Sequence, residues 1–354
     1  MRRSTHDLVP LLLGALLLLA LTGCGSTSSS AGSGGNGQIA VRLGYFPNMT
    51  HAVALVGVAR GTFQKAFGSN ARLETKTFNA GPALIEALFA GAIDIGYVGP
   101  NPAINGFVKS HGTALCIIAG ASSGGALFIV RPGTGIKGPQ DLAHKKLATP
   151  QLGGTQDVAL RYYLQQHGLQ TIEKGGTVQI LPTDNPNILT LFKQGKIDGA
   201  WVPEPWASRL IVEGQGTVFL DERSLWPGGR FVTTNVIVRK GFLDEHPDLV
   251  SKFLAAHVET VQYIQANAGS AKTIVNNAIK SITGKGLSTK VLDHAFRNLD
   301  ITYDPLAGTL VQSADRAFAL GYLGSSKPDL NGIYDLDPLN KVLASKGLTA
   351  VSGS

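Results

Sequence analysis

The hydrophobic pattern along the chain alternates between two kinds of segment. Short apolar runs rich in Val, Ile and Ala are typical of buried strands, and longer stretches with apolar positions at helical spacing are typical of amphipathic helices. The expected strands cover residues 39–46, 72–78, 92–99, 113–121, 126–131, 145–150, 177–182 and 197–202, with a further strand from residue 232. The expected helices cover residues 52–67, 82–91, 102–110, 155–168, 187–195 and 204–214, and the pattern is mostly helical from Pro247 onward.

This alternation predicts the α/β fold class, with parallel or mixed sheets flanked by helices. Residues 83–103 and 187–207 share one plan: a helix, a glycine, an Ile-Asp pair, a strand of small residues and a Pro-x-Pro turn. Asp94 and Asp198 open the two strands. The repeat predicts two similar lobes whose strand ends meet at one crevice, which is where open α/β sheets bind ligands.

The N-terminal residues have the pattern of an export signal. Two arginines precede an apolar run at 8–21, which is too short for a comfortable membrane span and typical of a signal peptide. The run ends in Leu-Thr-Gly-Cys at Cys24, which resembles the bacterial lipobox. We therefore expect a signal peptide over 1–23, a lipid such as palmitate on Cys24 and a flexible Gly/Ser tether over 24–37. This places the body at the extracytoplasmic side of the cell membrane.

The cysteine content and the charge of the chain restrict which metals, cofactors and macromolecules it is expected to bind. Cys116 lies in an apolar run and is expected to be a small core hydrophobe. The sequence shows no Cys-x-x-Cys and no His/Cys cluster with metal spacing, so we expect no metal and no cofactor. The net charge is +7, but Lys and Arg are scattered. The pattern therefore predicts no nucleic-acid partner, while an anionic ligand remains open.

Two motifs typical of enzymes occur in the wrong context. Gly-x-Ser-x-Gly at residues 120–124 is followed by a strand, whereas a hydrolase elbow is followed by a helix. We interpret Ser122 as part of a Ser/Gly loop facing a ligand. Gly-x-Gly-x-x-Gly at residues 133–138 does not open a helix, so we interpret it as a turn connecting the lobes. No catalytic residue is predicted.

Three expected helix starts follow strand ends and carry glycine or proline. They lie at Thr155, at residues 80–83 and at residues 100–103. Free N–H groups at a helix N-terminus favour an anion. Because these starts are spread over both predicted lobes, they favour one shared anion site; the alternative is that they are ordinary helix caps.

Three segments together carry a family resemblance: FNAGPALIEALFAGAIDIGYVGPNPAI, ATPQLGGTQDVALRYYL and AWVPEPWASRL. Over about residues 38–270 the chain resembles the solute-binding lipoproteins of ABC importers for sulfonate, nitrate and taurine, relatives of thiamine-pyrimidine-precursor-binding proteins. The resemblance implies a two-lobed, type II periplasmic-binding-protein (Venus-flytrap) fold with a two-strand hinge, near 128–131 and 234–238. It divides the body into lobe one, residues 38–130 and 236–354, and lobe two, residues 131–235.

The resemblance also implies which residues bind the ligand. They are Phe46, Asn48, His51, Gly81, Pro82, Asn101, Ser122, Ser123, Gly154, Thr155, Trp201 and Glu204. The motifs contain no Lys or Arg at these positions, so an oxyanion would be held by neutral donors. Glu204 would disfavour an anion unless it is protonated or turned away.

We therefore expect a monomeric, extracytoplasmic solute-binding lipoprotein. It would close around a small anionic solute, an aliphatic sulfonate or taurine-like compound, and deliver it to the permease subunits of an ABC importer. Nitrate, bicarbonate or a pyrimidine thiamine precursor are the alternative solutes. An enzyme on the same fold, such as a pyrimidine-precursor synthase, is disfavoured by the export signal and the missing catalytic set.

Overall fold

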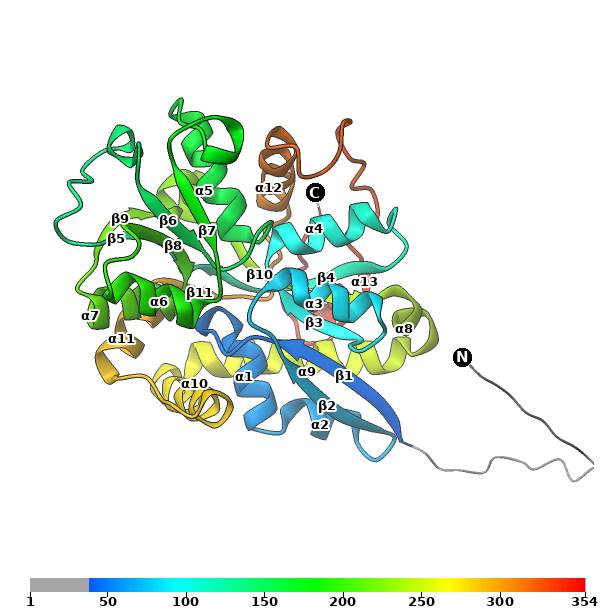
Figure 1. Ribbon diagram of the computed structural model, residues 1–354. Helices are drawn as coiled ribbons and strands as arrows, with labels where there is room; N and C mark the ends of the chain where they lie inside the picture. Colours follow the sequence, from blue (N-terminus) through cyan, green and yellow to red (C-terminus); the bar gives the residue numbers. More distant parts are fainter. Residues whose placement is uncertain (1–37, 354) are drawn as a thin grey trace, which may run out of the picture. The chain divides into compact units, whose positions relative to one another are not determined.

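The computed structural model describes residues 38–353, so the expected signal peptide, lipid anchor and tether lie outside the described residues. The described chain forms two mixed β-sheets flanked by helices (Figure 1), which confirms the expected α/β class. No helix in residues 38–353 is both long and apolar enough to cross a membrane.

Sheet A has six strands in the order β11-β4-β10-β3-β1-β2. Strands β1, β2 and β3 are parallel, and β10 runs antiparallel between β3 and β4. The strands are β1 (Ile39–Tyr45), β2 (Ala71–Thr77), β3 (Ile95–Val98), β4 (Leu115–Gly124), β10 (Val232–Arg239) and β11 (Leu299–Ile301).

Sheet B has five strands in the order β7-β6-β8-β5-β9. Strands β6, β7 and β8 are parallel, and β5 runs antiparallel between β8 and β9. The strands are β5 (Ala126–Val130), β6 (Lys146–Thr149), β7 (Gln179–Pro182), β8 (Gly199–Pro203) and β9 (Thr217–Asp221).

Helices bury both faces of sheet A. Along β4, Cys116 and Ile118 join the hydrophobic cluster formed with α1, α2, α9, α10 and α13, whereas Leu115 and Ile117 join the cluster formed with α3, α4 and α12. This is the two-residue alternation of a strand buried on both faces. The helices are α1 (Ala52–Ala59), α2 (Thr62–Phe67), α3 (Gly81–Phe89), α4 (Pro100–Lys109), α8 (Lys240–Glu245), α9 (Pro247–Ala266), α10 (Ala268–Thr283), α11 (Thr289–Arg297), α12 (Ala307–Ala319) and α13 (Asp337–Ser345).

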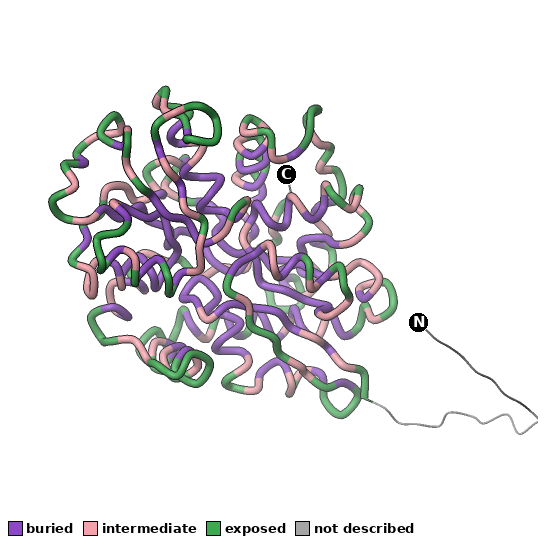
Figure 2. Tube along the Cα trace, in the orientation of Figure 1, coloured by how far each residue is buried: buried purple, intermediate pink, exposed green. Residues whose placement is uncertain are grey.

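Sheet B is covered in the same way. Leu127 and Ile129 of β5 pack with α6 and α7, and Phe128 and Val130 pack with α5. Figure 2 shows the buried positions concentrated in the strands and on the inner faces of the helices. The helices are α5 (Thr155–Gln166), α6 (Asn185–Lys193) and α7 (Trp206–Gly214).

The chain crosses between the sheets earlier than the sequence suggested. It leaves sheet A at Gly124 and Gly125, both with φ of +72°, and returns between β9 and β10. Strand β5 therefore belongs to sheet B and β10 to sheet A, so the boundaries after residue 130 and before residue 236 fall too late. The apolar pattern runs through β4 and β5 almost without a break, which hides the bend that the two glycines make.

Three further details differ from the expected elements. The segment 133–138 joins β5 to β6 within sheet B and is not a connection between lobes. The expected helix over 52–67 is two helices, because Gly61 between them adopts φ of +67°. Strands β9 and β11 were not expected; β11 has only three residues, whereas β9 contains the apolar run 218–220, so that signal was available.

The repeated sequence plan is also a structural repeat. Asp94 Oδ2 accepts a hydrogen bond from the backbone N–H of Arg42 at 3.0 Å, and Asp198 Oδ2 accepts one from the backbone N–H of Lys146 at 2.9 Å. Each aspartate thus fixes the start of its strand against the neighbouring parallel strand. The carboxyl ends of β3 and β8 consequently occupy equivalent places in the two sheets.

Candidate functional site

The loops that follow β1, β2, β3, β6, β7 and β8 meet at one small space of about 40 Å³, which we term the inter-sheet cavity. Both sheets therefore contribute their parallel strands' carboxyl ends to it, as in the ligand crevices of open α/β sheets. The lining residues are Phe46, Asn48, Thr50, His51, Asn79, Ala80, Gly81, Gly99, Pro102, Pro150, Gln151, Gly154, Thr155, Gln156, Asn185, Pro203, Thr233 and Thr234.

Four helices begin at the cavity. The three helix starts expected from the sequence are brought together: Gly81 at α3, Gly99 as the residue preceding α4, and Thr155 at α5. The first residue of α6, Asn185, also lines the cavity and was not expected there. The partial positive charge of four helix N-termini, two beside each sheet, therefore surrounds a space the size of a small anion.

Four buried side-chain atoms in the lining lack a hydrogen-bond partner. They are Gln151 Oε1, Thr155 Oγ1, Asn185 Oδ1 and Thr234 Oγ1. A buried polar atom without a partner costs about 1–3 kcal/mol, so native proteins rarely retain several in one place. The hydroxyls can donate, and each amide can present its NH₂ after a half-turn. This cluster is suited to a ligand that accepts hydrogen bonds.

His51 contributes a neutral ring to the cavity. Its Nδ1 accepts a hydrogen bond from the backbone N–H of Phe46 at 3.3 Å, and the two rings lie 4.2 Å apart. Burial lowers the pKa of His51 to about 3, so the ring is uncharged and keeps its proton on Nε2 as a donor. None of the described residues that line the cavity carries a formal charge at neutral pH.

Of the twelve residues expected at the site, six line the cavity. They are Phe46, Asn48, His51, Gly81, Gly154 and Thr155. Pro82 lies beside them in the first turn of α3 but does not line the space. Asn101 is buried in the first turn of α4, where its Nδ2 donates to the carbonyl of Ser313.

The two serines do not form a ligand-facing loop. Both lie within β4, where Ser122 Oγ donates to the carbonyl of Thr50 and Ser123 Oγ accepts from the backbone N–H of Phe231. Their hydroxyls are thus used in the connection between β4 and its neighbours. A hydroxyl in a loop and one on a bulged strand have the same sequence pattern, which explains the error.

Trp201 and Glu204 also point elsewhere. The Trp201 ring stacks on Phe128 inside sheet B at 5.4 Å, and its Nε1 donates to Glu222. Glu204 is fully buried, where it accepts from the backbone N–H and Oγ of Ser208 and, at 2.7 Å, from Nδ2 of Asn298. Burial raises the pKa of Glu204 to about 7. Glu204 therefore does not oppose an anion in the cavity.

Sequence reasoning missed several lining residues. Asn79 and Gln151 stand between a strand and a helix, and Asn185 opens the helix after β7; this arrangement identified Gly81 and Thr155, so the signal was available. Thr233 and Thr234 lie on β10, an antiparallel strand, and the strand-end rule does not apply to them. Only their place beside β4 in the folded sheet brings them to the cavity.

Hydrogen bonds join the two sheets' elements around the cavity. Trp206 Nε1 donates to Asn48 Oδ1 at 2.9 Å, and Asn79 Nδ2 donates to Asp184 Oδ2 at 3.1 Å. The backbone N–H of Met49 donates to the carbonyl of Glu204 at 3.0 Å. These bonds hold the lining loops of the two sheets together.

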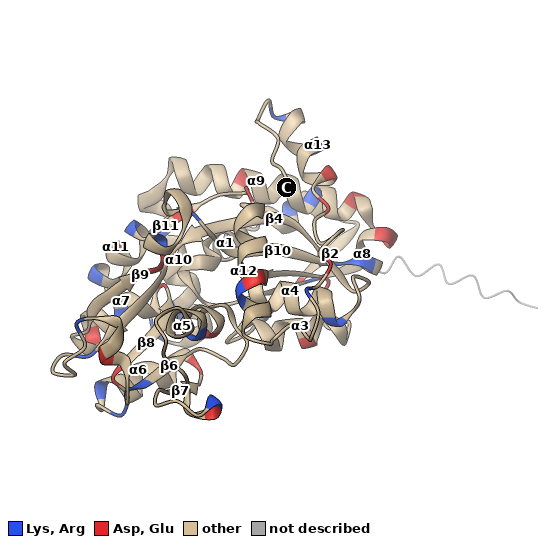
Figure 3. Cartoon of the chain, turned by 90° about the horizontal axis from the view of Figure 1, so that it is seen from above, with Lys and Arg blue, Asp and Glu red and all other residues tan. Residues whose placement is uncertain are grey.

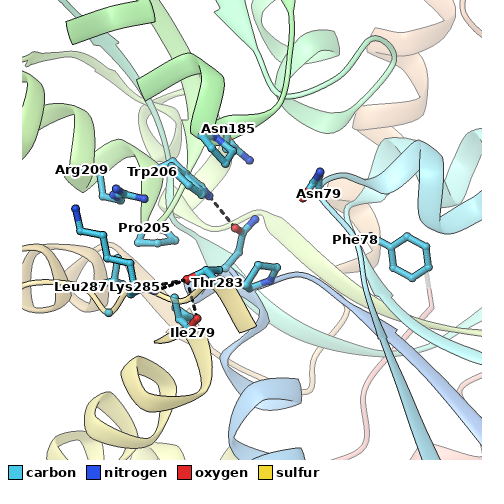
Figure 4. Close-up of a pocket in the computed structure, with 14 residues that line it drawn as sticks. Phe78, Asn79, Asn185, Pro205, Trp206, Arg209, Ile279, Thr283, Lys285 and Leu287 are labelled. Carbon is cyan, nitrogen blue, oxygen red and sulfur yellow. Dashed lines mark hydrogen bonds between the residues drawn. The ribbon is translucent and has the colours of Figure 1, made fainter. Parts of the chain in front are cut away.

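A second space of about 200 Å³, the Trp206 groove, adjoins the inter-sheet cavity (Figure 4). Asn48, Asn79 and Asn185 line both spaces. The other residues that line the groove are Pro47, Phe78, Pro186, Pro205, Trp206, Arg209, Ile279, Thr283, Lys285, Gly286 and Leu287.

Two further expectations concern charge and metal binding. Lys and Arg are interspersed with Asp and Glu over the described body (Figure 3), in agreement with the scattered sequence pattern. In residues 38–353 no group of three His, Cys, Asp or Glu side chains is placed to hold a metal ion. Cys116 is buried as expected, which raises the pKa of its thiol to about 12.

Comparisons with known proteins agree with this geometry. A profile of the NMT1-like family matches residues 34–278. The taurine-binding periplasmic protein of Escherichia coli (strain K12) is 28% identical over 214 residues. That match covers 60% of this chain and 63% of the E. coli protein, less than two thirds of its length.

Solved structures show the same fold. The alkanesulfonate-binding protein SsuA from Xanthomonas axonopodis pv. citri, bound to MOPS, has a TM-score of 0.67 at 19% identity, covering 81% of this chain and 94% of that chain. The periplasmic nitrate-binding protein NrtA from Synechocystis PCC 6803 has a TM-score of 0.69 at 16% identity, covering 87% and 89%. These likenesses confirm the expected periplasmic-binding-protein architecture. All three relatives are named as binding proteins.

Proposed function

The chain belongs to the NMT1-like family, and from this premise we propose that it binds a small oxyanionic solute outside the cell and delivers it to an ABC importer. The observation that carries the proposal is the inter-sheet cavity itself. Its donors are neutral and come from four helix N-termini, two beside each sheet. Such a site stabilises an anion only when both sheets are in place, which is the property of a closing binding protein.

A sulfonate fits the chemistry of this cavity. Its three oxygens carry one delocalised charge and accept many hydrogen bonds, which matches a lining of hydroxyls, amides and backbone N–H groups. Two of the proteins similar to this chain are named for taurine and for alkanesulfonate, and the latter holds MOPS, itself a sulfonate. An aliphatic sulfonate or taurine-like compound is therefore the proposed solute.

Nitrate is the second candidate. The volume of about 40 Å³ corresponds to roughly three water molecules, which would also accommodate a free small oxyanion. Neutral donors suit nitrate as well as a sulfonate. An organic sulfonate carries a carbon substituent that must extend out of the cavity, whereas nitrate has no such substituent.

The anchor and the partner complete the proposal. A lipid on Cys24 would hold the protein at the extracytoplasmic face of the cell membrane, and residues 25–37 would serve as a tether. One lobe would be built on sheet A and the other on sheet B, with the crossings at Gly124–Gly125 and before β10 as hinge. The closed, monomeric form would dock on the permease, and no bond in the solute would change.

Thermal unfolding of the full-length chain in detergent tests the solute. Methanesulfonate, taurine, nitrate, bicarbonate and a pyrimidine thiamine precursor would each be added at increasing concentration. A ligand at a hundredfold excess over its Kd stabilises the native state by about 2.7 kcal/mol. A rise in Tm with methanesulfonate supports the proposal, a rise with nitrate alone selects the second candidate, and no rise with either oxyanion contradicts both.

Labelling tests the anchor separately. Cells expressing the chain would be given radioactive palmitate, with the C24S variant as the control. Label on the wild-type chain and none on C24S supports the lipid at Cys24. Equal labelling of both chains contradicts it.

A further inference from the structure

The Trp206 groove continues the inter-sheet cavity outward. Three asparagines, Asn48, Asn79 and Asn185, line both spaces, so a ligand that fills the cavity and extends past these side chains enters the groove. Figure 4 shows Trp206 and Asn185 on one side of the groove and Asn79 and Phe78 on the other. The groove is thus the path by which any substituent on the solute leaves the cavity.

The volumes of the two spaces indicate which one takes the head of the solute and which one takes its tail. The cavity, at about 40 Å³, has room for a group the size of about three water molecules. A sulfonate head fills this space, and a carbon chain attached to it does not fit as well. The groove, at about 200 Å³, is five times larger and can take such a chain or a ring.

The groove wall is largely apolar. Prolines, aromatic rings and aliphatic side chains make up half of its lining: Pro47, Phe78, Pro186, Pro205, Trp206, Ile279 and Leu287. Each methylene buried against such a surface contributes about 0.8 kcal/mol, or roughly fourfold in affinity. This surface favours a solute with a hydrocarbon or aryl tail.

The charges near the groove disfavour an ammonium group. The charged residues in its described lining are Arg209 and Lys285, and none that lines the groove or the cavity is acidic. Two carboxylates on adjoining segments lie outside the lining: Glu213 is paired with Arg209 at 2.7 Å, and Asp184 accepts a hydrogen bond from Nδ2 of Asn79. An ammonium in the groove would therefore lose water beside two cationic side chains and meet no carboxylate in the lining.

We propose that the Trp206 groove holds the apolar, uncharged tail of a sulfonate whose head occupies the inter-sheet cavity. This inference rests on the proposed function and narrows its solute to alkane- or arylsulfonates. Taurine has an ammonium at the end of a two-carbon chain and is a poor ligand on this basis. Propane-1-sulfonate replaces that ammonium by a methyl group of about the same size and is the preferred ligand of the pair.

The first test is calorimetric titration of the full-length chain with matched sulfonates. We expect propane-1-sulfonate to bind at least tenfold more tightly than taurine. From methane- to hexanesulfonate we expect affinity to rise two- to fourfold per added methylene. Taurine binding as tightly as propane-1-sulfonate, or affinity that does not depend on chain length, would overturn the inference.

The second test fills the groove. T283W adds a large ring at a groove-lining position of α10, where the Thr283 Oγ1 donates to the carbonyl four residues earlier. Thr273, also exposed on α10, makes the same kind of bond to Gly269 but does not line the groove, so T273W is the matched control. We expect T283W to weaken hexanesulfonate at least tenfold more than it weakens methanesulfonate, and T273W to weaken neither.

The outcomes separate this inference from the proposed function. If methanesulfonate binds but T283W and T273W act alike on the long sulfonates, the groove does not hold the tail and the head site stands. If no sulfonate binds the wild-type chain, the proposed sulfonate function fails first, and the groove assignment falls with it.

Discussion

Trp206 and Asn48 are joined by a hydrogen bond from the indole Nε1 to the amide Oδ1, 2.9 Å long, although they lie 158 residues apart. Trp206 opens α7 beside sheet B, and Asn48 follows β1 of sheet A. Both groups are buried. Asn48 lines the inter-sheet cavity. The bond therefore holds a cavity residue in place where the loops of the two sheets meet.

Replacing Trp206 by Phe keeps most of the ring and removes the donor. The buried Oδ1 of Asn48 would lose its partner, at a cost of about 1–2 kcal/mol in the closed form, so we expect the Kd for methanesulfonate to rise about tenfold. Trp226→Phe is the matched control, because Trp226 is equally buried and donates to Glu222, which does not line the cavity. Equal effects of the two variants on Kd would show that the Asn48 bond is not specific to binding.

Thr155 provides a direct test of the helix N-terminus at the cavity. Its buried Oγ1 has no partner among the described residues. Thr155→Val keeps the shape and removes the donor, and we expect at least a tenfold loss of methanesulfonate affinity with little change in Tm. Thr155→Ser restores the hydroxyl and should bind within about threefold of wild type, whereas the larger Thr155→Leu should abolish binding. Wild-type affinity in Thr155→Val would exclude Thr155 as a ligand donor.

Gly99, which follows β3 of sheet A, lies next to Thr155. A Cβ at Gly99 would clash with Thr155 Oγ1, so Gly99→Ala forces the Thr155 side chain or the two segments to shift. We expect the Kd for methanesulfonate, measured by calorimetry, to rise more than tenfold. In Gly308→Ala the added methyl group meets no atom within 4 Å, and this control should bind as wild type. Retained affinity in Gly99→Ala would mean that binding does not require this contact.

The buried carboxyl of Glu204 predicts a pH dependence. Burial raises its pKa to about 7 in the folded protein, above the ordinary carboxyl value of 4.5 in the unfolded chain. The folded state therefore holds the proton more strongly, and this contribution to stability is complete below pH 4.5 and is lost as pH rises through 7. Glu204→Gln cannot titrate, so its stability relative to wild type should rise with pH, by at most about 3 kcal/mol.

Urea unfolding at pH 5 and pH 8 measures this difference. Comparing Glu204→Gln with wild type at each pH cancels the other buried groups, among them Glu222, His51 and His257. Glu213→Gln is the control: Arg209 lowers the pKa of Glu213, so its contribution changes below pH 4.5 and the relative stability of this variant should not change between pH 5 and pH 8. A relative stability of Glu204→Gln that falls with pH would contradict the assignment.

Much of the fold follows from local patterns. Apolar runs and helical spacing predict nine of the strands and most helices, because burial on both faces leaves a clear signal. The Asp94 and Asp198 repeat predicted two related sheets, and their equivalent hydrogen bonds agree with it. The crossing at Gly124 and Gly125 was misplaced, since two glycines in an apolar run do not reveal where a strand changes sheet.

Half of the residues expected at the site line the inter-sheet cavity, and the division has a physical reason. Residues at helix starts, such as Gly81 and Thr155, follow a rule that links sequence position to the carboxyl edge of a sheet. Glu204 directly follows β8, but Trp201 lies in the middle of that strand, where side-chain direction alternates, and its ring points into the core of sheet B. Thr234 reaches the cavity through long-range pairing of β10, for which no local pattern exists.

The four helix N-termini at the inter-sheet cavity have a consequence for the proposed closure around a solute. Their partial charges are all positive, so they repel one another whenever the two sheets approach. An anion between them turns this repulsion into attraction and acts as the counterion that makes closure favourable. Under the proposed function, release of the solute would restore the repulsion, and the same helices would favour separation of the two sheets.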